Sequence, residues 1–111
     1  MSKEIFFRSV WGDEHCGRIR SNEYVHGGGV ALSLWVNDDG YPEPWADMTV
    51  NLDVPAANGC VFLDTNNFPE VVEIFRDYAL GEPTGRVRAS GWCVYPEYRL
   101  NNERLNEYVV G

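Results

Sequence analysis

The amino-acid sequence predicts an α+β domain, in which an antiparallel β-sheet carries one main α-helix packed on its apolar face. Three observations support this fold class. Short segments alternate apolar and polar residues with the period of a half-buried strand. Turn sequences of Gly, Asn, Asp and Pro separate these segments. One segment, residues 71–79, carries its apolar residues at helical spacing instead.

The first strands are predicted in the N-terminal third of the chain. Residues 5–10 are bulky and apolar enough for a strand, and residues 12–17 are predicted to form a turn or loop. Residues 18–25 are predicted to form a short strand of polar alternation. Three glycines follow His26 and are interpreted as a flexible break, because glycine tolerates almost any backbone conformation.

Residues 30–36 and 47–52 alternate most cleanly, so two further strands are predicted there. In the second of these segments Met48 and Val50 point one way while Thr49 points the other. This pattern is typical of an antiparallel sheet with one dry and one wet face. Between the two segments, an Asp-Gly pair at residues 39–40 predicts a hairpin turn, which a Pro-rich loop extends.

Residues 60–63 are a short apolar run that predicts a buried strand, and the helix follows. Asn66 or Asn67 is the predicted N-cap, because its side-chain oxygen can accept a hydrogen bond from a free amide of the first turn. The Leu80-Gly81 pair is predicted to end the helix. The apolar face of the helix consists of Val71, Ile74, Phe75, Tyr78 and Ala79.

The C-terminal part predicts one more strand, over residues 86–95, bent near Ser90-Gly91 and continued at residues 98–100. The tail, residues 103–110, fits a short helix or a last strand. There is no repeat, linker or shift in composition, so residues 1–111 are predicted to form a single domain.

The chain is strongly acidic and rich in aromatic residues. Its 17 acidic and 9 basic residues give a net charge of −8, and 14% of its residues are aromatic, enough for a real core. Such a charge repels phosphate backbones and anionic membranes, so docking onto a basic protein surface is expected and direct nucleic-acid or membrane binding is not. The alternative is that the acidity only keeps the protein soluble.

The location predicted from the sequence is the cytoplasm. No apolar run approaches the roughly 20 residues that span a bilayer, and the N-terminus lacks the apolar core of a signal peptide. Cys16, Cys60 and Cys93 are an odd number of cysteines without C-x-x-C spacing, so they are expected to be free thiols.

No catalytic constellation can be assembled, so the sequence predicts a protein that is not an enzyme and has no cofactor. The H-G-G-G run at residues 26–29 matches the oxyanion loop of some esterases, but that chemistry needs a G-x-S-x-G nucleophile elbow, which the sequence lacks. His15 and Cys16 are one adjacent pair, whereas metal ligands usually come as two separated pairs. No metal is therefore predicted, and zinc held by His15, Cys16 and a distant residue is the alternative.

Acidic residues are the predicted partner-binding surface. Glu70, Glu73 and Asp77 form one stripe of the helix, and Asp38 and Asp39 stand at the tip of the predicted hairpin. The alternative interpretation is an ordinary solvated face.

Two other features have a functional and a structural interpretation. Residues 64–67 lie between a buried strand and the helix, where they form either a ligand-binding corner or a network of caps and Asx turns. Trp35 and Trp45 are either anchors for a partner or part of the core and its edge. The structural interpretation is favoured for both features.

Four short motifs resemble a known family. They are T-V-N at residues 49–51, D-T-N-N at 64–67, P-T-G at 83–85 and S-G-x-x-x-Y-P-x-Y at 90–98. This pattern resembles a family of small bacterial proteins described only as a domain of unknown function. The resemblance implies a setting among the accessory genes of plasmids, integrative elements and prophages, and it transfers no activity and no catalytic residue.

Accessory proteins of such elements often counter host defence, and this leads to the functional hypothesis. The protein is predicted to be a non-enzymatic acidic binding protein of a mobile genetic element, with anti-CRISPR or anti-restriction activity. It would inhibit a host defence nuclease as a DNA mimic, by occupying the basic nucleic-acid-binding surface of that enzyme. The alternatives are a small-ligand or metal-binding accessory domain and a structural subunit of a phage or conjugation apparatus.

Overall fold

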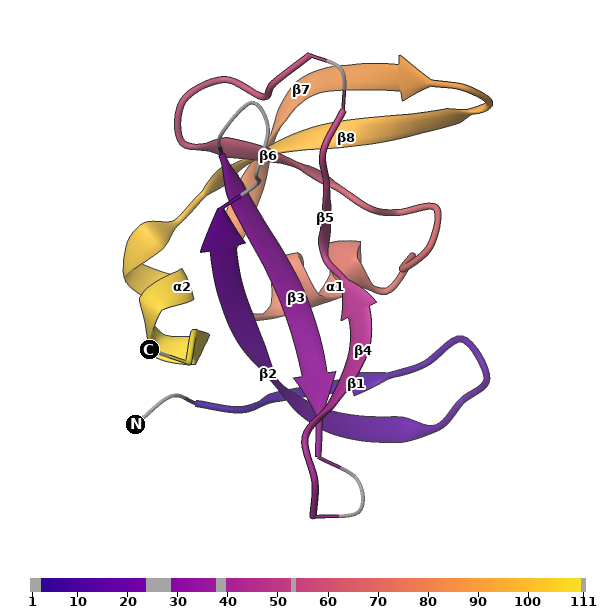
Figure 1. Ribbon diagram of the computed structural model, residues 1–111, viewed down its shortest axis with the longest axis vertical. Helices are drawn as coiled ribbons and strands as arrows, with labels where there is room; N and C mark the ends of the chain where they lie inside the picture. The colour runs from indigo at the N-terminus through magenta and orange to yellow at the C-terminus, as the bar shows by residue number, and fades with distance from the viewer. Residues whose placement is uncertain (1–2, 24–28, 38–39, 53, 111) are drawn as a thin grey trace.

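The computed structural model of the protein describes residues 3–23, 29–37, 40–52 and 54–110 (Figure 1). Its strands form two antiparallel sheets of four strands each. The first sheet has the order β1-β2-β3-β4 and consists of β1 (Ile5–Arg8), β2 (Glu14–Glu23), β3 (Val30–Val36) and β4 (Glu43–Asp47). The second has the order β5-β6-β8-β7 and consists of β5 (Thr49–Val50), β6 (Cys60–Leu63), β7 (Gly81–Ser90) and β8 (Cys93–Leu100).

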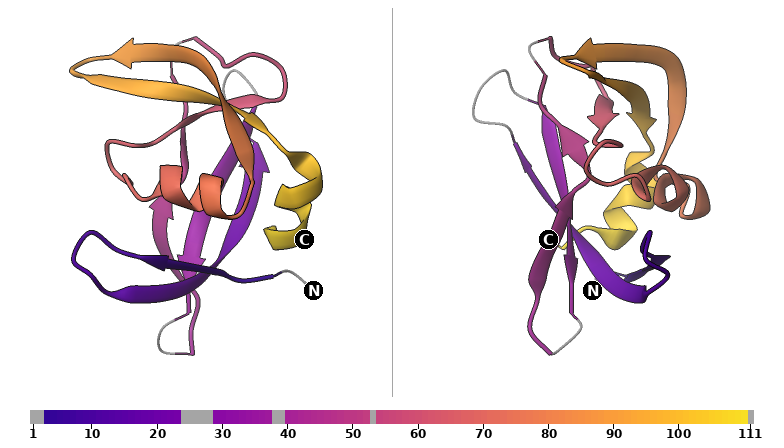
Figure 2. Two further views of the ribbon diagram at one scale, coloured as in Figure 1. Left: turned by 180° about the vertical axis from the view of Figure 1, so that it is seen from behind. Right: turned by 90° about the vertical axis from the view of Figure 1, so that its right-hand side faces the viewer.

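The described residues also include two helices, α1 (Val71–Asp77) and α2 (Asn102–Tyr108). Figure 2 shows both helices on the same side of β2 and β3, with the β7–β8 hairpin at one end of the molecule and the β1–β2 hairpin at the other. None of the helical segments described is long and apolar enough to cross a bilayer.

The two sheets are joined at Met48, which lies between β4 and β5 and is fully buried. The Met48 amide donates to the Leu32 carbonyl at 2.8 Å, and the Asp64 amide donates to the Met48 carbonyl at 3.0 Å. The buried Thr49 hydroxyl accepts a hydrogen bond from the Leu32 amide at 3.1 Å. This segment therefore connects β3 of the first sheet to the second sheet, and each of these polar groups has a hydrogen-bond partner.

One hydrophobic core fills the space between the sheets and the helices. Apolar side chains from both sheets and both helices belong to it, and burial of this kind supplies most of the stabilisation of a small domain. Its fully buried members include Ile5, Ile19, Leu34, Leu63, Phe68, Val71 and Phe75.

The predicted α+β class with antiparallel strands is confirmed, but the single sheet with one main helix is not. The described residues form two sheets, and the two helices among them are equally short, at seven residues each. The predicted bent strand over residues 86–95 is in fact two strands, β7 and β8, connected by a turn at Gly91, which has φ +61°. Such a positive φ favours glycine. The turn at Gly91 reverses the direction of the chain, whereas the sequence predicts a bend within one strand.

Predicted strand bounds are confirmed where the pattern of buried residues along the segment identifies the strand. β3 and β6 have the predicted bounds, and the uncertain tail is the helix α2. Two predicted loops are strands, because pairing with a neighbour overrides local preference: β2 starts already at Glu14, opposite Arg8, and β4 includes Pro44. Pro44 is tolerated because β4 lies at the edge of its sheet.

The helix α1 begins and ends differently from the prediction. Its N-cap is Glu70, which makes no side-chain hydrogen bond to the first turn, and Asn67 donates hydrogen bonds to Asp64 instead of capping the helix. After the C-cap, Ala79 adopts the left-handed conformation with φ +54°. Glycine usually occupies that position because a Cβ atom is strained there.

We therefore expect Ala79→Gly to stabilise the protein by about 0.5–1 kcal/mol, since relief of the strain exceeds the extra entropy of glycine in the unfolded chain. Urea unfolding monitored by tryptophan fluorescence measures the change. The matched control is Ala89→Gly in β7, which removes the same methyl group from an exposed residue without a positive φ. The control is expected to lose about 0.5–1 kcal/mol. A loss of stability in Ala79→Gly as well would contradict the strain argument.

Candidate binding surface

The three predicted helix acids line one groove of about 290 Å³ between α1 and the β1–β2 hairpin. The helical spacing of Glu70, Glu73 and Asp77 places them on the side of α1 that faces this groove. Glu14 of β2 and Arg8 of β1 line the opposite side. We call this site, formed by Arg8, Glu14, Glu70, Glu73 and Asp77, the acidic groove. The other two predicted contacts, Asp38 and Asp39, lie outside the described residues.

Tyr78 fixes the width of the acidic groove. Its hydroxyl accepts a hydrogen bond from the Phe6 amide at 2.7 Å and donates one to the Phe6 carbonyl at 3.1 Å. Because β1 is an edge strand of its sheet, these Phe6 backbone groups have no strand to pair with on that side. The tyrosine thus replaces a neighbouring strand and holds the end of α1 against β1.

The acidic groove carries an excess of negative charge. Its lining has four carboxylates and one guanidinium, that of Arg8, which is 2.7 Å from the Glu14 carboxylate. Outside the groove, Arg76 contacts Asp77 at 3.1 Å. Both ion pairs are largely exposed to solvent, where such pairs contribute little stability and are screened by salt. A cationic group of a partner is therefore attracted to this site.

An apolar notch adjoins the acidic groove and shares Glu70 with it. The notch also has a volume of about 290 Å³, and its lining includes Val10, Trp11, Trp45 and Phe68. Trp11, in the turn between β1 and β2, is 80% exposed. A tryptophan so exposed beside a charged groove is a common kind of anchor in protein interfaces.

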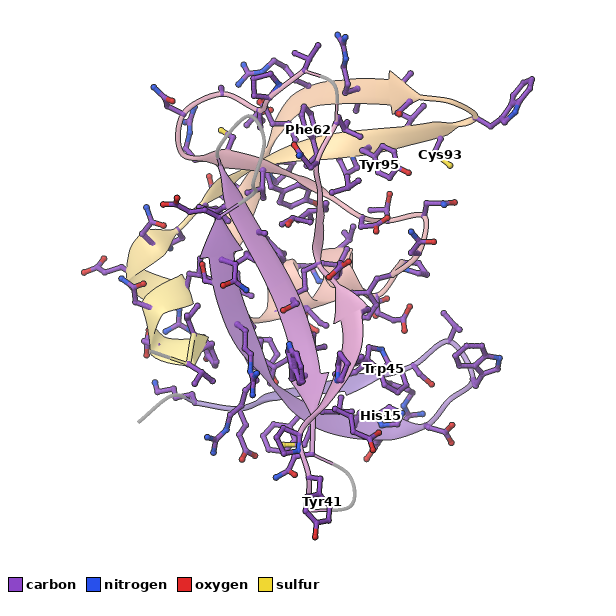
Figure 3. All side chains as sticks on the ribbon, viewed as in Figure 1. His15, Tyr41, Trp45, Phe62, Cys93 and Tyr95 are labelled. Atoms are coloured by element: carbon purple, nitrogen blue, oxygen red, sulfur yellow. The ribbon has the colours of Figure 1, made fainter. Side chains whose placement is uncertain are left out.

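The notch is supported by a cluster of rings. Figure 3 shows Trp45 beside His15, and their ring centroids are 4.3 Å apart. The centroid of the Phe7 ring lies 5.7 Å from that of Trp45. Trp45 is half-buried, and the core-edge interpretation is correct for it. Trp35 also packs within the molecule, since the Arg20 guanidinium lies 4.0 Å from its ring centroid. The sequence predicts all four tryptophans in or beside the core, and this prediction is wrong for Trp11 and Trp92, which stand exposed in hairpin turns.

The alternative sites predicted from the sequence have structural roles. The Cys16 thiol donates to the Glu4 carboxylate at 2.6 Å, and none of the three cysteines, all of them described, is in a disulfide. Among the residues that the structure describes, no three His, Cys, Asp and Glu side chains are placed to hold a metal ion. At residues 64–67, the buried Asp64 carboxylate accepts hydrogen bonds from Asn67, which is the Asx-turn interpretation.

A buried carboxylate on β8 lies outside the residues predicted from the sequence. Glu97 is 4% exposed, and one of its oxygens accepts hydrogen bonds from the Thr84 hydroxyl at 2.8 Å and from Arg86 Nε at 2.7 Å. Its other oxygen accepts from the Ala57 amide at 3.2 Å. The available signal was the pair of motifs P-T-G-R and Y-P-E-Y, which β7 and β8 bring together. These two motifs therefore mark a structural network.

This network lowers the pKa of Glu97. Burial alone would raise the pKa of its carboxyl group, but the hydrogen bonds from Thr84, Ala57 and Arg86 favour the charged form and outweigh burial. A carboxyl whose pKa is lower in the folded than in the unfolded protein stabilises the fold above its ordinary pKa of 4.5, and that contribution is lost as the pH falls through the folded value.

We expect Glu97→Gln to lower the free energy of unfolding by about 2 kcal/mol at pH 7, because the charged hydrogen bonds are lost. As the pH falls below 4.5 and through the lowered pKa of Glu97, the difference from the wild-type protein is expected to shrink, since Glu97 itself becomes protonated. Urea unfolding at several pH values measures both effects. Glu82→Gln, an exposed change on β7, is the control and is expected to cost less than about 0.5 kcal/mol. A difference that persists at low pH would contradict the role of the charge.

Comparison with known proteins identifies the family of the chain. No curated protein and no solved structure matches the chain. The model of the family DUF4313, described as a domain of unknown function, matches residues 19–110 and so covers β2 from Ile19 onwards and every later element. Since the match spans most of its 111 residues, the chain belongs to the DUF4313 family.

Proposed function

We propose that this protein is a non-enzymatic acidic binding protein of a mobile genetic element, which inhibits a host defence nuclease. In this proposal the acidic groove docks onto the basic surface on which a CRISPR effector or a restriction enzyme holds nucleic acid. The observation that supports it most is the convergence of Glu70, Glu73 and Asp77 with Glu14 on one groove. A row of carboxylates offers a basic surface the same sign of charge as a phosphate backbone.

The composition of the whole chain supports the same class of partner. A net charge of −8 steers the protein towards a positively charged surface and speeds association at low salt. Binding through the acidic groove is therefore salt-sensitive, whereas binding through a purely apolar contact is not. The exposed Trp11 beside the groove adds apolar contact area near its edge.

The test is the plaquing efficiency of phage on cells with an active CRISPR or restriction system, with and without this protein. Wild-type protein is expected to restore plaquing. Glu73→Lys with Asp77→Lys is expected to abolish the effect and to weaken binding to the captured nuclease at least roughly tenfold, because both carboxylates become repulsive. The matched control reverses two exposed acids elsewhere, Glu82→Lys with Glu103→Lys, and is expected to retain activity.

Two results would contradict this proposal. Wild-type protein that leaves plaquing unchanged in every defence system would exclude the inhibitor function. Equal loss of activity in the groove variant and in its control would assign the effect to net charge and not to the acidic groove.

A second candidate function, small-ligand binding, is favoured by a cavity of about 360 Å³ at the other end of the molecule. Its size falls within the range of ligand sites in proteins. The described residues that line it are apolar or uncharged, and they include Ala56, Cys60 and Phe62. An uncharged small molecule is therefore the class of ligand that fits.

For this second function, thermal-shift screening with uncharged metabolites is expected to yield a ligand that raises the melting temperature. Ala56→Trp is expected to remove that shift by filling the cavity, whereas the variant with Glu73→Lys and Asp77→Lys is expected to retain it. A ligand that stabilises the Ala56→Trp variant equally would exclude this cavity as the site.

A further inference from the structure

Glu70 is a buried acid at the junction of the acidic groove and the apolar notch. It lines both sites, and it is only 9% exposed. Although Glu70 is the N-cap of α1, its side chain makes no capping hydrogen bond. Within the part of the chain that the structure describes, no hydrogen bond or ion pair reaches its carboxylate. The carboxylate oxygens themselves keep contact with solvent, so they are open to a cation, which would pair with a charge that the protein leaves unpaired.

The two sites that Glu70 lines indicate which kind of cation fits beside it. On one side the acidic groove supplies Glu14, Glu73 and Asp77, which attract positive charge. On the other side the notch supplies the rings of Trp11 and Trp45 and other apolar side chains. An arginine side chain matches both, because its planar guanidinium bonds a carboxylate in a bidentate manner and stacks on aromatic rings. Lysine carries a compact and strongly hydrated charge, which matches the aromatic side less well.

We propose that Glu70 receives an arginine side chain of the basic partner, with the guanidinium on the Glu70 carboxylate and the side-chain stem against Trp11. This inference rests on the proposed function, since it names the partner residue that the acidic groove takes. The neighbouring acids steer the arginine, and the pairing with Glu70 holds it. Glu70 thus determines specificity, whereas Glu73 and Asp77 mainly set the rate and salt dependence of association.

The test uses small probes and needs no nuclease. The ¹⁵N-labelled protein is titrated with N-acetyl-arginine amide and followed by ¹H–¹⁵N NMR. Saturable shifts are expected at the amides around Glu70 and at the Trp11 indole. N-acetyl-citrulline amide has nearly the same shape without the charge, and at equal concentration it is expected to cause no such shifts. N-acetyl-lysine amide is expected to bind at least several-fold more weakly.

The variant Glu70→Gln keeps the size of the side chain and is expected to weaken binding of the arginine probe at least tenfold. A well-dispersed spectrum of this variant shows that it is folded. Trp11→Ala is expected to weaken binding several-fold. The control Trp92→Ala is not, because Trp92 lies on the other hairpin and is fully exposed.

Three outcomes would overturn the inference: equal shifts with the citrulline probe, equal affinity for the lysine probe, and unchanged affinity in Glu70→Gln. The test separates this inference from the proposed function. Binding of the arginine probe without any effect on plaquing would support the Glu70 site and reject the nuclease as its partner. Restored plaquing without arginine binding would reject the Glu70 site alone.

Discussion

The crossing of the chain from one sheet to the other at Met48 is the constraint on which the rest of the structure depends. A strand that leaves one sheet for another exposes backbone groups inside the core, where an unpaired amide or carbonyl is costly. Here the Met48 amide donates to the Leu32 carbonyl, and the Met48 carbonyl accepts from the Asp64 amide. The Thr49 hydroxyl accepts from the Leu32 amide. The two sheets therefore share one core and cannot separate without breaking these buried bonds.

The crossing also positions the acidic groove. Because Asp64 follows β6 and bonds to Met48, the segment that leads into α1 starts from a fixed point. Its turn is closed by Asp64 and Asn67, and the buried Phe68 then anchors the start of the helix. Tyr78 fixes the other end of α1 on β1. Both walls of the groove are thus held by buried or paired groups, so the backbone positions that carry its carboxylates are set before any partner arrives.

The sequence predicts those features that depend on neighbours along the chain. The period of β3 and the apolar run of β6 identify these strands with their bounds, and the helical stripe of Glu70, Glu73 and Asp77 is visible as a pattern. The pairing of distant segments is not visible. The addition of Glu14 to the groove depends on how the β1–β2 hairpin packs on α1, more than 50 residues later. The Glu97 network likewise needs the β7–β8 register, and local patterns do not specify that register.

The burial of Glu70 bears on whether the acidity of this chain serves only for solubility. Solubility requires exposed charge, and Glu73 and Asp77 are exposed. Glu70 contributes almost nothing to the solvated surface, because it is 9% exposed and stands between an aromatic notch and other acids. A glutamine of the same size would fill the same place without the charge that Glu70 leaves unpaired. Solubility therefore accounts for the exposed acids, whereas the largely buried and unpaired Glu70 is the residue on which the proposed arginine pairing depends.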